Sequence, residues 1–539
     1  MSNVYLSNSP YIAFDLVKKE NMAKEFNITG TCFPEDHYMA DVSKKMGQIY
    51  KMVEKGNYFI INRPRQYGKT TALQTITDFY RKNNDYLVFY ISFEGIGDAI
   101  FEEENRFALG FVSLLARHIK SADLALSEWL SENMVGIKDF NGVSDLITAF
   151  ANKTSKKLLL IIDEVDKSSN NQLFVSFLAM LRNKYLARKE QKTFHSVVLA
   201  GLHDVKSLKL KLRPDDEKKY NSPWNIAAEF KVDMNLYPDE IKFMLDDYVS
   251  ETGVKMDTES ISNRLFYYTS GYPFLVSKLC KVVDEDILPT KTIQEWTYDD
   301  LEKAVQILVF ENNTNFESLI KNIENNADLY DLVYKIAIDG EPLPFNVYNP
   351  TINLGLLYGI FANKNGLKIH NRIYNEVLLD YMSVKMLLSR VSKSDNGFGY
   401  KHADGSLNME AVLLGFQIFM KKEYNKKDRD FLEKNGRLVF LAFIKPIING
   451  SGYDFKEPQI SEERRLDVVI TYLQHKYVAE LKIWRGQKEH EKGLIQLNDY
   501  LDRQSLTEGY LLIFDHSEVK NWHSEWIEIE GKKVFMAWV

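Results

Sequence analysis

The sequence predicts an α/β protein: a parallel sheet near the N-terminus, a helical middle and a second, smaller α/β domain at the C-terminus. Short apolar runs alternate with helical stretches through about residue 210, which is typical of parallel strands buried on both faces. From about residue 237 to 310 the pattern is helical, and alternating apolar and polar residues return near the C-terminus. With 539 residues, the chain is too long for one hydrophobic core.

The expected elements follow in order along the chain. The strands of the first sheet are expected at NYFIIN (57–62), DYLVFYISF (85–93), KLLLIIDE (157–164) and HSVVLAG (195–201). The break SGYPF (270–274) predicts a tight turn between helices. Residues 316–390 predict a small helical unit ending in short strands, and the polar stretch 392–406 predicts a linker. The hairpin RRLDVVITYLQHKYVAELKIW follows two further helical segments.

Bulk properties exclude several classes. The net charge of −7 argues against a protein that coats nucleic acid or anionic membrane through its overall field. Two distant cysteines, Cys32 and Cys280, fit no metal-binding spacing and predict reduced thiols. Neither a signal peptide nor an apolar run of roughly 18 residues is present. We therefore expect a soluble, cytoplasmic protein with no membrane partner.

The stretch NRPRQYGKTT (62–71) carries the first functional pattern, between a predicted strand and a predicted helix. In a phosphate-binding loop, backbone N–H groups and the helix N-terminus surround phosphates, a lysine neutralises their charge, and the next hydroxyl ligates magnesium. Gly68, Lys69 and Thr70 fill these positions. Arg63 stands where such loops begin with glycine, so we expect the loop to follow a different backbone path there.

The predicted strand KLLLIIDE supplies an acidic pair. Asp163 would hold magnesium and Glu164 would polarise the attacking water. Adjacent strand residues point to opposite sides, so both can act only where the strand ends. The arginine that fast hydrolysis requires stays open between Arg182, Arg188 and Arg213.

The segment from FNITGTCFPEDHYM through RPRQYGKTT resembles the AAA-like ATPase domains of bacterial proteins related to the STAND ATPases, in which an RPRxxGKT start replaces the usual glycine. LLLIIDEVD, SVVLAGLHDVKSLK and TSGYPFLVSKLC extend the resemblance. It implies that Tyr38 flanks adenine, as an alternative to plain core packing, and that His203 lies in a sensor region. The residues expected to bind nucleotide are Tyr38, Arg63, Gln66, Tyr67, Gly68, Lys69, Thr70, Thr71, Asp163 and His203.

The C-terminal hairpin carries the second pattern. Asp467 lies on its first strand, and Glu480 and Lys482 lie two residues apart on the second, so their side chains share a face. Buried charges need partners. Two carboxylates and a lysine would find them around Mg²⁺ and a phosphate group. An exposed, weak ion pair on an edge strand is the alternative interpretation.

The spacing Asp467–x12–Glu480–x–Lys482 resembles the PD-(D/E)XK nuclease superfamily. The superfamily implies a further acidic metal ligand, for which Glu433 is the candidate and Glu457 its rival. Gln496 and Tyr500 match its QxxxY extension. Together, Thr70, Asp163, Glu433, Asp467 and Glu480 are the predicted metal ligands, and Glu164, Asp467, Glu480 and Lys482 the predicted catalytic residues.

These resemblances predict an ATPase that regulates a metal-dependent nuclease, with ATP and Mg²⁺ as cofactors and DNA rather than RNA as substrate. The expected domains are an AAA-like core (1–236), a helical lid (237–315), a winged-helix-like unit (316–391) and a nuclease-like domain (407–539). The alternative is a nucleotide-switched scaffold whose C-terminal domain binds nucleic acid or a partner without cutting. Assembly into a homo-oligomer is left open.

Overall fold

The chain forms two compact units. The computed structural model describes residues 24–94, 98–165, 172–201, 226–339, 343–390, 399–402, 404–423, 436, 439–441, 443–444, 447–448, 452–456, 468–472, 475–484, 486–515 and 522–539. The first unit comprises Met1–Asn315, Leu357–Gly359 and Asn371–Ile373. The second comprises Phe316–Leu356, Ile360–His370 and Tyr374–Val539. No helix among the described residues is long and apolar enough to cross a bilayer.

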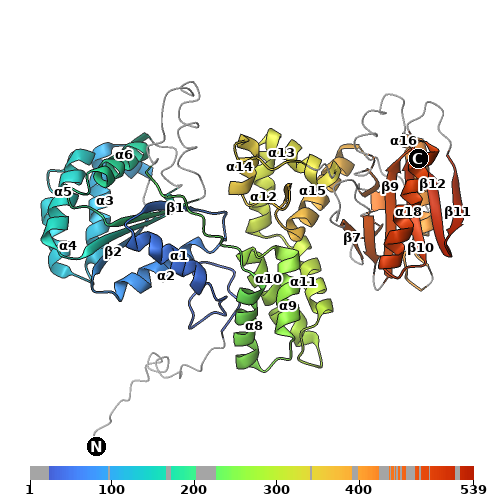
Figure 1. Cartoon of the computed structure of the whole chain (residues 1–539), viewed down its shortest axis with the longest axis horizontal. Coiled ribbons are helices and arrows are strands. Elements are labelled where there is room, and N and C mark those ends of the chain that lie inside the picture. Colours follow the sequence, from blue (N-terminus) through green and yellow to red (C-terminus); the bar gives the residue numbers. More distant parts are fainter. Residues whose placement is uncertain are drawn as a thin grey trace, which may run out of the picture. The chain divides into compact units, whose positions relative to one another are not determined.

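A four-stranded parallel sheet forms the centre of the first unit (Figure 1), which confirms the predicted α/β class. Its strands are β1 (Tyr58–Asn62), β2 (Tyr86–Ser92), β3 (Lys157–Asp163) and β4 (Ser196–Gly201), in the order β1-β4-β3-β2. Asn62 pairs with Gly201, and Ser92 pairs with Asp163. All four carboxyl ends therefore meet at one edge of the sheet.

Helices cover both faces of this sheet because its strands are apolar on both sides. One face packs against α3 (Glu104–Ile119), α4 (Leu124–Asn133), α5 (Phe140–Lys153) and α6 (Gln172–Leu186). The other packs against α1 (Ser43–Glu54) and α2 (Lys69–Arg81). Successive residues of β2 alternate between the two cores, since Leu87 and Phe89 face the first and Val88 the second.

Four further helices follow in the first unit, where the sequence predicts a lid, and we call them the lid part after that prediction: α8 (Pro238–Thr252), α9 (Thr258–Thr269), α10 (Pro273–Val282) and α11 (Tyr298–Phe310). The predicted break at SGYPF is the turn between α9 and α10. Ser270 and Gly271 are both left-handed there, with φ of 49° and 76°. A Cβ at Gly271 would overlap the carbonyl oxygen of Leu236, so only glycine fits this close approach.

The second unit begins with α12 (Thr314–Glu324, from Phe316 on), α13 (Ala327–Tyr334) and α14 (Pro350–Leu357), followed by the antiparallel pair β5 (Phe361–Asn363) and β6 (Leu367–Ile369) and by α15 (Arg372–Arg390). Its later part is a six-stranded sheet in the order β11-β12-β10-β9-β8-β7. The strands are β7 (Gly452–Lys456), β8 (Val468–Tyr472), β9 (His475–Ile483), β10 (Glu508–Phe514), β11 (Ser524–Ile529) and β12 (Lys532–Trp538).

This second sheet is mixed. Strands β7, β8 and β9 form an antiparallel meander, whereas β10 is parallel to both β9 and β12. The crossover from β9 to β10 is α18 (Gln487–Arg503), which lies along the sheet (Figure 1). Its Leu497 and Leu501 pack on one face of the sheet. On the other face, Phe416 of α16 (Met409–Glu423) contacts Phe514 of β10.

Candidate functional site

The loop between β1 and α2 has the form of a phosphate-binding loop, with an unusual entry. Gly68 is the N-cap of α2 and is left-handed, with φ of 74°; its carbonyl accepts from the N–H of Ala72 at 2.9 Å. The other left-handed residue of the loop is Gln66, with φ of 55°. Arg63 is not left-handed. The backbone bend that a first glycine would allow therefore falls elsewhere, as expected from the sequence.

Arg63 acts as an anchor for the loop. Its guanidinium donates to the carbonyl of Val232 at 2.7 Å and to that of Asn62 at 2.9 Å, and it lies 5.0 Å from the ring centroid of Phe230. Burial lowers the pKa of Arg63, opposed by the charge of nearby groups. Arginine remains protonated at neutral pH. The charged guanidinium of Arg63 therefore connects the start of the loop to the segment around Val232, which leads into the lid part.

The following loop residues are also held from outside. The Tyr272 hydroxyl donates to the carbonyl of Arg65 at 2.6 Å, and Asn315 Nδ2 donates to Gln66 Oε1 at 2.9 Å. Tyr67 is 5% exposed; its hydroxyl donates to the side chain of Asn235, and its ring lies 4.5 Å from that of Tyr272. Burial raises the pKa of Tyr67, so its hydroxyl stays a donor. Gln66 and Tyr67 thus have side-chain partners outside the loop, in the stretches that flank the lid part and in the turn between α9 and α10.

Lys69 and Thr70, the first two residues of α2, occupy the expected positions. The Lys69 ammonium donates to the carbonyls of Arg63 and Pro64 at 2.9 and 2.8 Å, which places it against the loop. The Thr70 hydroxyl donates to Asp163 Oδ2 at 3.1 Å. Asp163, at the end of β3, is 3% exposed. The tertiary structure therefore brings together the hydroxyl and the carboxylate, which are hard oxygen donors suited to Mg²⁺.

Glu164 turns out of the strand as the sequence required. Its φ is 53°, a left-handed conformation that is costly for a residue with a side chain, and its N–H donates to Asp163 Oδ1 at 2.9 Å. Strain of this kind at a strand end commonly marks a functional position.

Tyr90 is a residue that the sequence reading missed. Its hydroxyl lies 3.4 Å from Asp163 Oδ2, and burial, followed by the charge of Asp163, raises its pKa. No local sequence signal identifies it, because its position depends on β2 lying next to β3 in the sheet, where Ser92, two residues after Tyr90, is the partner of Asp163.

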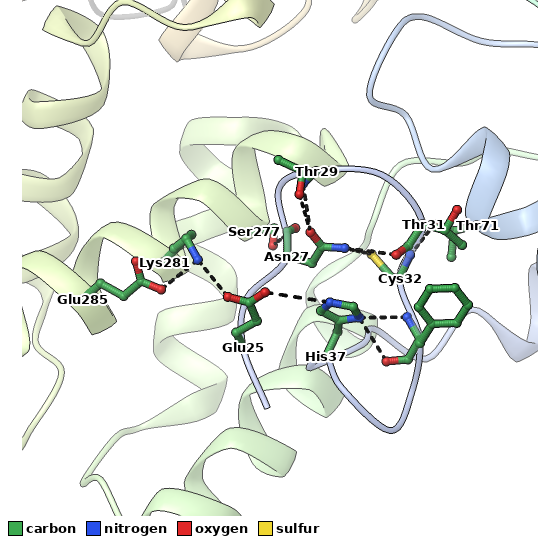
Figure 2. Close-up of polar contacts among 11 residues, drawn as sticks. Glu25, Asn27, Thr29, Thr31, Cys32, His37, Thr71, Ser277, Lys281 and Glu285 are labelled. Atoms are coloured by element: carbon green, nitrogen blue, oxygen red, sulfur yellow. Dashed lines mark hydrogen bonds and ion pairs between the residues drawn. The ribbon is translucent and has the colours of Figure 1, made fainter. Parts of the chain in front are cut away.

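The segment 24–38, which includes Tyr38, the residue that the resemblance assigned to the adenine side, connects α2 with the lid part (Figure 2). At one end, the Cys32 N–H donates to the Thr71 hydroxyl at 3.1 Å. At the other, Ser277 of α10 donates to the carbonyl of Asn27 at 2.6 Å, and Lys281 pairs with Glu25 at 3.1 Å. Thr71 is therefore tied through this segment to the lid part of the same unit.

Tyr38 and His203 were predicted from the resemblance alone, and only Tyr38 lies among the described residues. Tyr38 is 4% exposed and packs against Phe26 and Tyr248 at centroid distances of 4.9 and 5.2 Å. Its hydroxyl is buried without a hydrogen-bond partner among the described residues. His203 lies outside the described residues. Arg213, one of the three arginines considered for hydrolysis, does too.

The predicted C-terminal cluster is described in part. Glu480 is 1% exposed on β9, and its Oε1 lies 2.5 Å from Lys482 Nζ. Lys482 also donates to Gln496 Oε1 at 3.0 Å, which brings α18 into the cluster. Tyr500 lies on the same helix and packs against the core beneath it. Asp467, Glu433 and Glu457 lie outside the described residues.

A carboxylate this deeply buried is unlike the exposed edge-strand pair that was the alternative interpretation. The Glu480–Lys482 pair lies on an interior strand, between β8 and β10, on the face that α18 covers. Buried ion pairs seldom add stability over apolar residues of similar size. Within the described part of the chain, no group of three or more His, Cys, Asp or Glu residues is placed to hold a metal ion.

A parallel sheet that places a GKT loop at the start of α2, next to an aspartate at the end of β3, defines the P-loop class of nucleotide-binding folds. Residues 36–336 match the family described as "AAA-like domain". Since the match spans more than half of the 539 residues, the chain belongs to the AAA-like domain family.

Solved structures give more distant likenesses. The RuvB Holliday junction branch migration motor of Thermotoga maritima is 13% identical, with 66% of this chain and 98% of that chain covered at a TM-score of 0.32. The ORC2 protein of Aeropyrum pernix, solved as ADPNP–ADP complexes, is 13% identical over 66% of this chain and 97% of its own, at 0.33. The ORC1 protein of Aeropyrum pernix in complex with DNA is 12% identical over 65% and 95%, at 0.30. Among proteins with curated descriptions, no match was found. The family match is therefore the comparison that defines the class.

Proposed function

We propose that the protein binds and hydrolyses ATP in its first unit and thereby regulates a metal-dependent nuclease site in its second unit, which acts on DNA. The observation that carries the nucleotide part is the contact between Thr70 and Asp163, 93 residues apart in sequence. The observation that carries the nuclease part is the buried group of Glu480, Lys482 and Gln496.

In the nucleotide site, the residues proposed to surround the phosphates are those of the loop and the first turn of α2: Arg63, Gln66, Tyr67, Gly68, Lys69, Thr70 and Thr71. Lys69 would exchange its two carbonyl partners for phosphate oxygens, which carry more negative charge. Thr70 and Asp163 would hold Mg²⁺, whose role when bound is to neutralise charge on the phosphates. Loop N–H groups at the N-terminus of α2 would add donors.

For hydrolysis, Glu164 would take a proton from the attacking water, and its left-handed backbone directs it away from the run of β3. Tyr38 and His203 are retained as proposed adenine and sensor contacts, from the resemblance. The buried Tyr38 hydroxyl, without a partner among the described residues, is suited to receive a ligand group.

In the second unit, Glu480 and Asp467 would hold a Mg²⁺ ion, with Glu433 as a third ligand. Asp467 directly precedes Val468, which pairs with Ala479, the neighbour of Glu480. Lys482, held by Gln496, would orient a water molecule or stabilise charge on the scissile phosphate. The antiparallel meander β7-β8-β9, the crossover α18 and the parallel strand β10 support the proposed PD-(D/E)XK architecture.

The proposed domains are the AAA-like core (1–236), the lid (237–315), a winged-helix unit (316–391) and the nuclease domain (407–539). The β5–β6 hairpin between α14 and α15 supports the winged-helix assignment. We propose that this unit transmits the nucleotide-bound state of the ATPase core to the nuclease domain. ATP binding would in this way allow the nuclease domain to cut.

The test is a cleavage assay with the full chain on plasmid and linear DNA, with and without Mg²⁺ and ATP. Wild-type protein is expected to cut only with the metal. Glu480→Ala and Glu480→Gln should abolish cutting, whereas Glu508→Ala, an exposed carboxylate on neighbouring β10, should not. Lys69→Ala should lose the ATP effect.

Cutting that survives both Glu480 variants would reject the site. The absence of cutting under every condition would instead support the scaffold alternative, with nucleotide binding retained. If Lys69→Ala cuts DNA as fast as wild-type protein does with ATP, the nuclease site works independently of nucleotide binding.

A further inference from the structure

A row of four rings lies beside the Glu480–Lys482 pair, at one edge of the second sheet. Strand β10 lies between β9 and β12 and is parallel to both, so the carboxyl ends of the three strands share this edge. Trp484 follows β9 directly, and Trp538 ends β12. His490, in the first turns of α18, lies between the two, with centroid distances of 5.5 Å to Trp484 and 5.9 Å to Trp538. His523 extends the row, 5.4 Å from Trp538. We call these residues the aromatic row.

The aromatic row is contiguous with the proposed cutting site. Trp484 lies two residues after Lys482 and four after Glu480, so the three side chains emerge on the same face of β9. Two residues of strand correspond to about 7 Å. Trp484 and Trp538 both pack against the core under α18, which places the row on the face that carries the charged pair.

The row is fixed in place by backbone contacts. The Trp484 N–H donates to the carbonyl of Phe514 at 2.9 Å, and the Trp538 N–H donates to that of His523 at 2.9 Å. Gln417 of α16 donates to the carbonyls of both His523 and Trp538, at 3.0 and 2.9 Å. Because the backbone at these positions is already ordered, ligand binding costs little backbone conformational entropy.

The rings are only half-buried, and cations lie at both ends. Trp484, His490 and Trp538 keep part of their surface in solvent, and the His523 side chain is 48% exposed. Lys482 lies at one end; at the other, the Lys421 ammonium lies 5.4 Å from the ring of Trp522, the neighbour of His523, and His523 itself lies 3.3 Å from the carboxylate of Glu525. Rings flanked by cations match the chemistry of unpaired bases linked by phosphates, because bases stack on aromatic faces while lysines neutralise the backbone.

We infer that the aromatic row stacks on the unpaired bases of single-stranded nucleic acid, either a free strand or the frayed end of a duplex, and leads that strand to Glu480 and Lys482. This inference rests on the proposed nuclease function and names its substrate form. A blunt, fully paired duplex hides its base faces and offers the row nothing to stack on.

The experiment measures binding of fluorescently labelled oligothymidine and of a blunt duplex to the full chain in EDTA, where metal-dependent cutting is suppressed. Wild-type protein is expected to bind the single strand more tightly. Trp484→Ala and Trp538→Ala should each weaken single-strand binding roughly 5- to 100-fold, the effect expected from losing a stacked base. Trp484→Phe should restore most of the affinity, since it keeps a ring.

The matched control is Trp526→Ala. Trp526 is 40% exposed on β11 and packs on Phe535, whose side chain points away from the face under α18. Its removal should leave both affinities unchanged. Unfolding temperatures of all variants separate lost stacking from lost structure, and Trp484→Phe provides a second, less disruptive comparison.

The outcomes separate this inference from the nuclease proposal. Metal-dependent cutting that Glu480→Gln abolishes, combined with single-strand binding that ignores Trp484→Ala, would overturn the inference and leave the nuclease standing. If single-strand binding depends on Trp484 but no cutting is seen, the nuclease proposal is overturned and the aromatic row remains a single-strand binding surface. Equal affinity for single strand and blunt duplex would overturn the inference.

Discussion

The Thr70 hydroxyl lies 3.1 Å from Asp163 Oδ2, which joins the first turn of α2 to the end of β3 across 93 residues of sequence. All strands of this sheet are parallel, so the loop that follows β1 and the end of β3 lie at the same edge, with β4 between the two strands. This contact makes a direct prediction about magnesium.

Asp163→Asn is expected to abolish the gain in nucleotide affinity that Mg²⁺ provides. The amide keeps an oxygen near Thr70 but loses the charge that a divalent cation needs. A charged contact worth about 1.5–3 kcal/mol corresponds to roughly 10- to 150-fold in affinity. Titration of a fluorescent ATP analogue with and without Mg²⁺ measures the effect. Asp85→Asn, an exposed aspartate before β2, is the control. A wild-type response to Mg²⁺ in Asp163→Asn would remove Asp163 from the site.

Arg63→Ala should destabilise the first unit by about 1.5–3 kcal/mol, because the Val232 carbonyl loses a charged donor. Arg63→Gly should be no more stable than Arg63→Ala, since Arg63 has no left-handed strain for glycine to relieve. Urea unfolding compares the two variants with Arg81→Ala, an exposed arginine at the end of α2. If Arg63→Gly proves clearly the more stable of the pair, the anchor interpretation is wrong.

Gly271→Ala should lower the unfolding temperature far more than Gly253→Ala. Both glycines are left-handed, with φ of 76° and 72°, so both substitutions carry the backbone cost of about 1–2 kcal/mol. Only at Gly271 would the added Cβ meet backbone, the carbonyl oxygen of Leu236; at Gly253 nothing lies within 4 Å. Overpacking adds roughly 1–3 kcal/mol at Gly271. Equal shifts in a thermal melt would show that the turn between α9 and α10 can move.

Cys32 should be the thiol that reacts first with an alkylating reagent in native protein, because Cys280 is fully buried. Burial raises the pKa of Cys32, so the rate should be slow at pH 7 and should keep rising through pH 9 as the thiolate forms. ATP with Mg²⁺ should slow the reaction further, since the Cys32 N–H is held by Thr71, next to Thr70. Mass spectrometry follows the modified peptide. Lys69→Ala should lose the protection, and protection that persists in that variant would detach segment 24–38 from the nucleotide site.

Much of the first unit could be predicted because its signals are local. Apolar runs of strand length flanked by helices define a parallel sheet, and GKT before a helix defines the phosphate loop wherever that helix lies. Arg63 shows the limit: the sequence indicated that the loop entry must differ, but the partners of the guanidinium, Val232 and Phe230, lie about 170 residues away. Tyr90 was missed for the same reason, since its role depends on which strand is its neighbour.

The amino-acid sequence by itself determined the class of this protein, the identity of the loop residues and the shared face of Glu480 and Lys482, because helix and strand periodicity fix which neighbouring side chains emerge together. Only the tertiary structure decided that Asp163 meets Thr70, that Gln496 reaches Lys482 and that Trp484, His490 and Trp538 form a row. The physical reason is that strand order and crossover connections bring distant residues together, and these are selected by burial of the whole apolar surface, which no local pattern contains.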